Sequence, residues 1–143
     1  MSKKSRDIEL FIVDIFVSLE KIKQYTLDFK NADSFKHSNL HWDATIRQLE
    51  IVGEALNHLL TDDKFATYAP KYFRKIVNFR NVIVHEYFGI DEEEVWDVVT
   101  HKLIMLNDDM RVIVKKINIT SAVLSVLDEV EDSDMKNMLK KLI

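Results

Sequence analysis

The chain has 143 residues, of which 47% are hydrophobic and 31% are charged, and its formal net charge is −4. This length and composition predict one globular domain and exclude a disordered or fibrous chain. Two glycines and one proline are far fewer than average usage, which disfavours a β-sandwich or a doubly wound sheet and favours long helices.

Several classes of protein are excluded by what the sequence lacks. It has no cysteine, so disulfides, thiolate metal sites and cysteine catalysis are not possible. Residues 1–10 are charged and do not resemble a signal peptide, and no apolar run approaches the length of a membrane span. We therefore expect a cytoplasmic protein with no membrane partner. The negative net charge argues against nucleic-acid binding by the whole surface.

The first half of the chain predicts two long helices. Apolar residues recur at steps of three and four over residues 4–29 and again over residues 40–60, which is the spacing of an amphipathic helix. Residues 30–39 are polar and interrupt the pattern, and residues 61–69 are predicted to form a loop.

A third helix follows the predicted loop. Pro70 suits a first helical turn, and the pattern continues to about Val84 or Glu86. Gly89 then marks a break in the chain.

Capping signals predict the remaining helices. Asp91 is followed by three glutamates, which is typical of the start of a helix, and this fourth helix extends to about Lys116. Thr120 and Ser133 are each placed to cap a short helix in the tail. The elements together predict an all-α antiparallel helical bundle of four to five main helices.

Arg80 stands out in the third helix because a helical wheel places it in the middle of the apolar stripe. A buried guanidinium without a partner is costly, so this position requires a carboxylate, a ligand phosphate or a water-filled cleft. A structural ion pair with Glu50 or Glu54 of the preceding helix is a competing interpretation, and both can hold at once. The stripe consists of Phe73, Ile76, Val77, Ile83, Val84 and Tyr87.

His85 falls on a different face of the same helix, about 140° from Arg80, whereas Asn81 falls only about 40° from His85. A straight helix would therefore pair Asn81 with His85 and leave Arg80 apart. Two geometries would reunite the arginine and the histidine: the helix unwinds near His85, or a second subunit brings its own copy alongside. A packing role is the alternative for a lone histidine.

Residues 64–85 contain five cations and no acidic residue, although the whole chain is acidic. This basic segment suits a phosphate-bearing partner, which makes Lys71, Arg74 and Lys75 candidate RNA-binding residues. A solvated basic face, balanced by the acids of residues 91–94, explains the charge pattern equally well.

Other polar groups in the sequence are weaker candidates. His37 and His41 have the spacing of a helical metal pair, but no third ligand is evident, so we predict no metal site. Glu50 and Glu54 share a helical face, where ion pairing is at least as plausible as paired-carboxylate chemistry. Gly53 between them permits a close helix crossing.

Two sequence blocks resemble a known family. The segment Arg80–Tyr87, RNVIVHEY, resembles the R-x4-H-x-Y element of the HEPN domain (higher eukaryotes and prokaryotes nucleotide-binding), in its HepT-like branch. Residues 47–55, RQLEIVGEA, resemble the second recurrent block of that branch, and residues 88–91 fit its continuation. The resemblance spans residues 7–116.

The resemblance implies a helical bundle that forms a homodimer, and we assign this bundle to residues 1–118. Residues 119–143 lie outside the resemblance, and we expect them to form a helical tail packed on the same domain. It implies the toxin of a toxin–antitoxin pair, a metal-independent endoribonuclease without a cofactor. The active cleft of such proteins forms where two copies of the motif face each other.

The resemblance also implies roles for single residues. Arg80 and His85 would be catalytic, Asn81 matches the polar residue that often follows the arginine, and Tyr87 matches the tyrosine to which a partner nucleotidyltransferase antitoxin adds AMP. These residue types suit RNA cleavage by attack of the 2′-hydroxyl group, since a histidine moves protons near neutral pH and a guanidinium stabilises a charged phosphorane.

Two other functions are compatible with the sequence. The first is a non-catalytic HEPN module that presents a nucleotide or a substrate to a partner nucleotidyltransferase. The second is a purely structural dimeric bundle in which Arg80 forms an ion pair.

Overall fold

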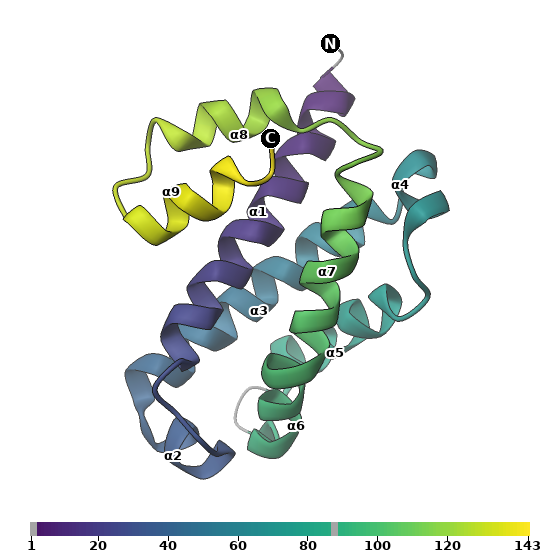
Figure 1. Ribbon diagram of the computed structural model, residues 1–143. Coiled ribbons are helices and arrows are strands. Elements are labelled where there is room, and N and C mark those ends of the chain that lie inside the picture. Colours follow the sequence, from purple (N-terminus) through teal and green to yellow (C-terminus); the bar gives the residue numbers. More distant parts are fainter. Residues whose placement is uncertain (1–2, 87–88) are drawn as a thin grey trace.

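The structure is a computed structural model that describes residues 3–86 and 89–143 (Figure 1). These residues form helices, turns and connecting segments without a β-strand, so the predicted all-α class is confirmed. Within these two ranges, no helix combines the length and the apolar composition that a membrane crossing requires.

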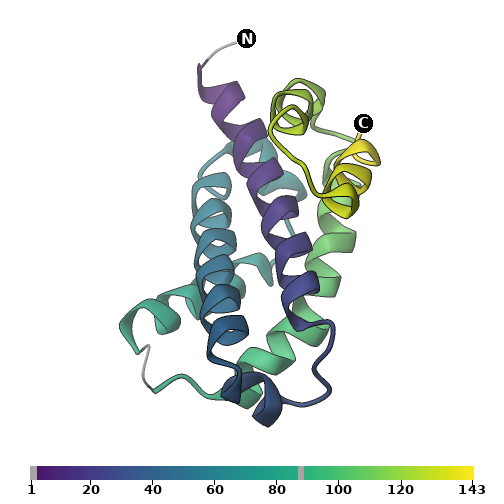
Figure 2. The ribbon, with the colours of Figure 1, turned by 90° about the vertical axis from the view of Figure 1, so that its left-hand side faces the viewer.

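Two long helices form the centre of the fold. Helix α1 spans Lys3–Thr26, and α3 spans Asn39–Leu59 and returns alongside it (Figures 1 and 2). Their three- and four-residue apolar spacing places side chains such as Ile12, Phe16 and Leu56 in the core, each at most 1% exposed. The two predicted long helices are therefore confirmed to within a few residues.

Two short helices replace segments that the sequence predicted to be irregular. Helix α2 (Ala32–His37) lies within the polar interval, and α4 (Asp63–Tyr68) lies within the predicted loop, so both expectations were wrong. Each helix is capped by a side chain that accepts a hydrogen bond from a backbone N–H: Asn31 from Ser34 at 2.9 Å and Asp62 from Phe65 at 3.0 Å.

Helix α5 spans Phe73–His85 and packs across α3. Pro70 lies in the turn just before it, and the carbonyl of Pro70 accepts a hydrogen bond from the N–H of Phe73 at 3.2 Å. Figure 2 shows the carboxyl end of α5 projecting past α3, on the side away from α1. The last turns of α5 are thus attached to the core along one face only, and Val82 and Val84 remain 40% and 45% exposed.

The predicted fourth helix is present, but it is interrupted. It consists of α6 (Glu92–Asp97), a π-helical turn η2 (Val98–Lys102) and α7 (Leu103–Ile113). Asp91 caps α6 as predicted, since its side chain accepts a hydrogen bond from the N–H of Glu93 at 2.9 Å. The π-helical turn has no counterpart in the sequence prediction.

The carboxyl-terminal tail forms α8 (Thr120–Leu127) and α9 (Ser133–Lys140), which pack on α1 (Figure 1). The predicted caps are each displaced by one residue. The cap of α9 is Asp132, whose side chain accepts a hydrogen bond from the N–H of Met135 at 2.8 Å, and α8 begins after Ile119. Thr120 and Ser133 are instead the first helical residues.

Candidate functional site

The stem of Arg80 lies directly against the backbone of α3 at Gly53. A methyl group placed on Gly53 would come within 2.2 Å of Arg80 Cβ and 2.6 Å of Arg80 Cγ. Real atoms do not approach so closely, so any larger residue at position 53 requires α3 and α5 to separate. Gly53 therefore permits the close helix crossing that the sequence predicted. This crossing fixes the position of the Cβ and Cγ atoms of Arg80.

The guanidinium of Arg80 is held by few partners. Its Nη1 donates a hydrogen bond to Asn81 Oδ1 at 3.1 Å, and its Nη2 lies 4.0 Å from Glu54 Oε2. Its Nε is buried and has no hydrogen-bond partner, while the side chain as a whole is 30% exposed. A guanidinium has five N–H donors, so most of its hydrogen-bonding capacity is unused.

Of the two carboxylates considered as partners for Arg80, Glu54 is the one that faces it. Glu50 instead pairs with Arg47 on its own helix, with Arg47 Nη1 3.4 Å from Glu50 Oε2. The Glu54 carboxylate is 57% exposed and sits at the outer limit of ion-pair distance, so it neutralises Arg80 only weakly.

His85 is the last residue of α5 and is exposed. Within the described chain, no hydrogen bond or ion pair joins it to Arg80, and α5 remains helical up to His85 rather than unwinding before it. Asn81 and His85 share a face of α5, as the sequence predicted, but no hydrogen bond joins them in the described chain. Asn81 Oδ1 instead accepts a hydrogen bond from Arg80.

A polar stripe runs along the exposed face of α5. Residues 74, 78, 81 and 85 follow one another at steps of four and three, so they share one face of the helix. Their side chains, Arg74, Asn78, Asn81 and His85, are all exposed. Asn78 had not been singled out in the sequence, although its spacing from Asn81 and His85 is the signal that identifies it.

The three basic candidates lie at the beginning of α5 and just before it. Lys71, Arg74 and Lys75 are exposed, and Arg74 Nη1 donates a hydrogen bond to Asn57 Oδ1 at 3.3 Å. The polar stripe thus starts among these cations and ends at His85. Tyr87, the predicted site of AMP addition, lies outside the described residues.

The histidines at 37 and 41 have local partners. His37 Nδ1 lies 2.7 Å from the carbonyl oxygen of Asp33, and His41 Nδ1 lies 2.7 Å from Ser38 Oγ. Among residues 3–86 and 89–143, no three histidine or acidic side chains are grouped closely enough to hold a metal ion.

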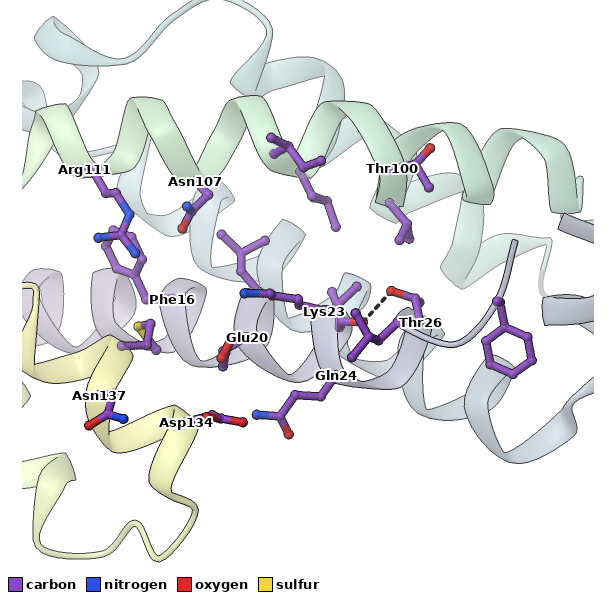
Figure 3. Close-up of a pocket in the computed structure, with 18 of the residues that line it drawn as sticks. Phe16, Glu20, Lys23, Gln24, Thr26, Thr100, Asn107, Arg111, Asp134 and Asn137 are labelled. Atoms are coloured by element: carbon purple, nitrogen blue, oxygen red, sulfur yellow. Dashed lines mark hydrogen bonds between the residues drawn. The ribbon is translucent and has the colours of Figure 1, made fainter. Parts of the chain in front are cut away.

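A pocket of about 880 Å³ lies elsewhere on the molecule, between α1, α7 and α9 (Figure 3). Apolar residues such as Phe16 and Leu103 line it together with Glu20, Lys23 and Arg111. Burial raises the pKa of Glu20, and the charge of Lys23 partly opposes that shift. None of the described residues that line this pocket belongs to α3 or α5, so it is separate from Arg80 and His85.

Comparison with known proteins identifies the family. Residues 15–117 match the family described as "Ribonuclease HepT-like". The chain is 30% identical to "Putative RNase MJ1380" of Methanocaldococcus jannaschii, over 79% of this chain and all of that protein. It is 30% identical to "Probable ribonuclease HepT" of Thermococcus cleftensis, over 62% of this chain and 79% of that protein.

A third relative is longer than this chain. The chain is 29% identical to "Gamma-glutamylcyclotransferase and putative RNase MJ0434" of Methanocaldococcus jannaschii, over 79% of this chain, and spans only half of that protein's length. No solved structure matches this one significantly. The family match covers most of the chain and includes both α3 and α5, which carry the candidate site. The chain belongs to the HepT-like ribonuclease family.

Proposed function

We propose that this protein is the endoribonuclease toxin of a toxin–antitoxin pair, and that it cuts RNA without a metal ion. The observation that carries the proposal is the state of Arg80, a guanidinium fixed at its stem, only weakly neutralised, and placed on the same helix as an exposed histidine. Family membership supports the same function.

The proposed reaction uses the RNA's own 2′-hydroxyl group. Its oxygen forms a bond to the adjacent phosphorus, the bond from phosphorus to the 5′-oxygen breaks, and the products are a 2′,3′-cyclic phosphate and a 5′-hydroxyl end. His85 moves the proton that this exchange requires, because an imidazole can both accept and donate a proton. Arg80 stabilises the charge that develops on the phosphorane oxygens.

Asn81 acts on Arg80 in this proposal. Asn81 Oδ1 accepts a hydrogen bond from Arg80 Nη1, so it orients the guanidinium. Such a bond restricts the rotation of the guanidinium and leaves its other donors free for a phosphate oxygen.

The proposal includes a homodimer in which two HEPN-type antiparallel bundles face each other. No hydrogen bond or ion pair joins Arg80 to His85 in the described chain. Arg80 lies against Gly53 of α3, whereas the carboxyl end of α5 projects past α3 (Figure 2). A second copy of α5 beside this end would bring the histidine of one subunit to the arginine of the other.

The activity is tested with purified protein and RNA in the presence of EDTA. The wild type is expected to produce 2′,3′-cyclic phosphate ends, and His85→Ala is expected to produce none while melting at nearly the same temperature, because His85 is exposed. His101→Ala, an exposed histidine on η2, is the matched control and is expected to cleave as the wild type does. Binding of AMP or ATP without any cleavage would instead favour a non-catalytic module.

Regulation by AMP addition at Tyr87 is part of the same proposal. A nucleotide attached near the motif would place bulk and negative charge where RNA must bind. Tyr87→Phe should therefore cleave RNA normally and escape neutralisation by a partner nucleotidyltransferase. Neutralisation of this variant as effective as that of the wild type would show that another residue is modified.

A further inference from the structure

Glu54 is the only carboxylate within ion-pair distance of Arg80 in the part of the chain that the structure describes. It approaches from α3, across the helix crossing at Gly53. The Nη2–Oε2 distance of 4.0 Å is too long for a hydrogen bond, and the carboxylate is 57% exposed. The attraction is therefore that of a solvated ion pair, which is weak.

Several contacts restrict the movement of Arg80. Its Cβ and Cγ lie against Gly53, its Nε is buried, and Asn81 holds Nη1. We therefore expect the guanidinium to keep its position whichever anion neutralises it. A phosphodiester oxygen can form short charge-assisted hydrogen bonds to a guanidinium, and these are stronger than a solvated carboxylate contact.

We propose that Glu54 is a displaceable counter-ion of Arg80, which partly neutralises the guanidinium in the free protein and gives way to an RNA phosphate in the complex. This inference rests on the proposed function, because it takes the displacing anion to be RNA. Glu54 is a positioning residue here, since it acts on the substrate only through Arg80.

The inference predicts an unusual effect of removing an acidic group. Glu54→Gln should bind a non-cleavable 2′-O-methyl oligonucleotide about two- to fivefold more tightly than the wild type, because the phosphate no longer competes with a carboxylate. In turnover, the same substitution should lower KM and leave kcat unchanged, since Glu54 does not touch the reacting atoms.

Glu50→Gln provides the matched control. It removes the same charge from the same helix, one turn away, but from a pair with Arg47 rather than Arg80. Any general gain in RNA affinity from a less negative surface appears in this variant too, so only the excess seen with Glu54→Gln reports on Arg80. Binding is measured by fluorescence anisotropy at fixed ionic strength, and thermal melting verifies that both variants fold.

A double-mutant cycle with Arg80→Ala completes the test. The excess effect of Glu54→Gln should vanish when Arg80 is absent. Equal gains from Glu54→Gln and Glu50→Gln, a gain that persists with Arg80→Ala, or no binding by any variant would each overturn the inference. The wild type could bind the oligonucleotide and show the coupling between Glu54 and Arg80, yet fail to cut RNA. That result would support the counter-ion role of Glu54 and contradict the proposed nuclease function.

Discussion

At the scale of single residues, Arg80 combines a fixed stem with a guanidinium that has too few partners. Burial of Nε without an acceptor costs free energy, and the weak contact with Glu54 recovers little of it. A residue kept for stability alone would be better satisfied. The arrangement is typical of a group that acquires its partners from a ligand.

Arg80→Ala should therefore abolish RNA cleavage while changing the melting temperature little, or even raising it. Arg47→Ala is the control, because this arginine is 65% exposed and contacts Glu50 on its own helix, so cleavage should persist. The measurements are thermal unfolding and an RNA cleavage assay on both variants. A loss of more than about 2–3 kcal/mol in the free energy of unfolding would make Arg80 chiefly a structural residue.

At the scale of helices, the crossing of α3 and α5 depends on the missing side chain at Gly53. Gly53→Ala should lower the free energy of unfolding by about 1–3 kcal/mol, because the new methyl group meets Arg80 Cβ, which no change of rotamer can move. The loss should outweigh the gain in helix propensity, which is at most about 1 kcal/mol.

Two second-site variants test whether the contact with Arg80 Cβ causes the loss of stability in Gly53→Ala. Arg80→Gly removes the opposing Cβ, so adding it to Gly53→Ala should recover most of the free energy of unfolding that Gly53→Ala loses. Arg80→Ala keeps that Cβ and should not recover it. Chemical unfolding of the three proteins makes the comparison. Equal rescue by both second-site changes would mean that the strain lies elsewhere.

The other end of α5 is attached to α7 by a hydrogen bond from the Tyr72 hydroxyl to Asp109. Burial raises the pKa of Tyr72, and the hydrogen bond to Asp109 and the charges of Asp109 and Asp108 raise it further. The fold favours the neutral phenol, so this stabilisation is complete below the unfolded-state pKa of about 10 and is lost as the pH rises above it.

Tyr72→Phe should consequently lower stability by about 1 kcal/mol at neutral pH, because it removes one hydrogen bond. It should also lose less stability than the wild type when the pH is raised from about 9 to about 11. Urea unfolding across this range measures both effects. Parallel stability curves for the two proteins would show that Tyr72 does not cause the alkaline loss.

The spacing of apolar residues predicts the long helices well, because α1 and α3 each contain enough turns for the pattern to repeat. Helices α2 and α4 have six residues each, too few to show a period, and only their caps at Asn31 and Asp62 mark them. The position of Arg80 on the apolar stripe was predicted, and Glu50 and Glu54 were predicted as its possible partners, of which Glu54 is the one within ion-pair distance. Which carboxylate faces it depends on how α5 crosses α3, and one helix alone does not contain that information.

At the scale of the whole molecule, the separation of Arg80 from His85 requires an explanation if both act on one phosphate. We expect light scattering at micromolar concentration to show a dimer. Mixing the two inactive variants Arg80→Ala and His85→Ala should restore roughly a quarter of the wild-type activity, because half of the dimers are then mixed and each has one complete site. A monomer, or a mixture as inactive as its components, would contradict a shared site.

Charge is unevenly distributed over the whole molecule, because cations gather at the start of α5 in an otherwise acidic chain. Lys71→Glu with Lys75→Glu should weaken RNA binding and reduce the salt slope by about 0.7 for each phosphate that the protein no longer neutralises. Lys102→Glu with Lys140→Glu makes the same change of charge at exposed positions outside α5 and serves as the control. Equal salt slopes of RNA binding for the two double variants would show that the basic segment is only a solvated face and does not bind RNA.

The π-helical turn η2 has a consequence for how chains of this kind are aligned. Val95, Val99 and Leu103 are all buried, yet they follow one another at two successive steps of four, which would leave the outer pair about 80° apart on a straight α-helix. The wider turn at residues 98–102 absorbs that difference in phase. A related chain with a continuous helix here needs one residue fewer, so the natural place for a one-residue gap is inside this helix and not in a neighbouring loop.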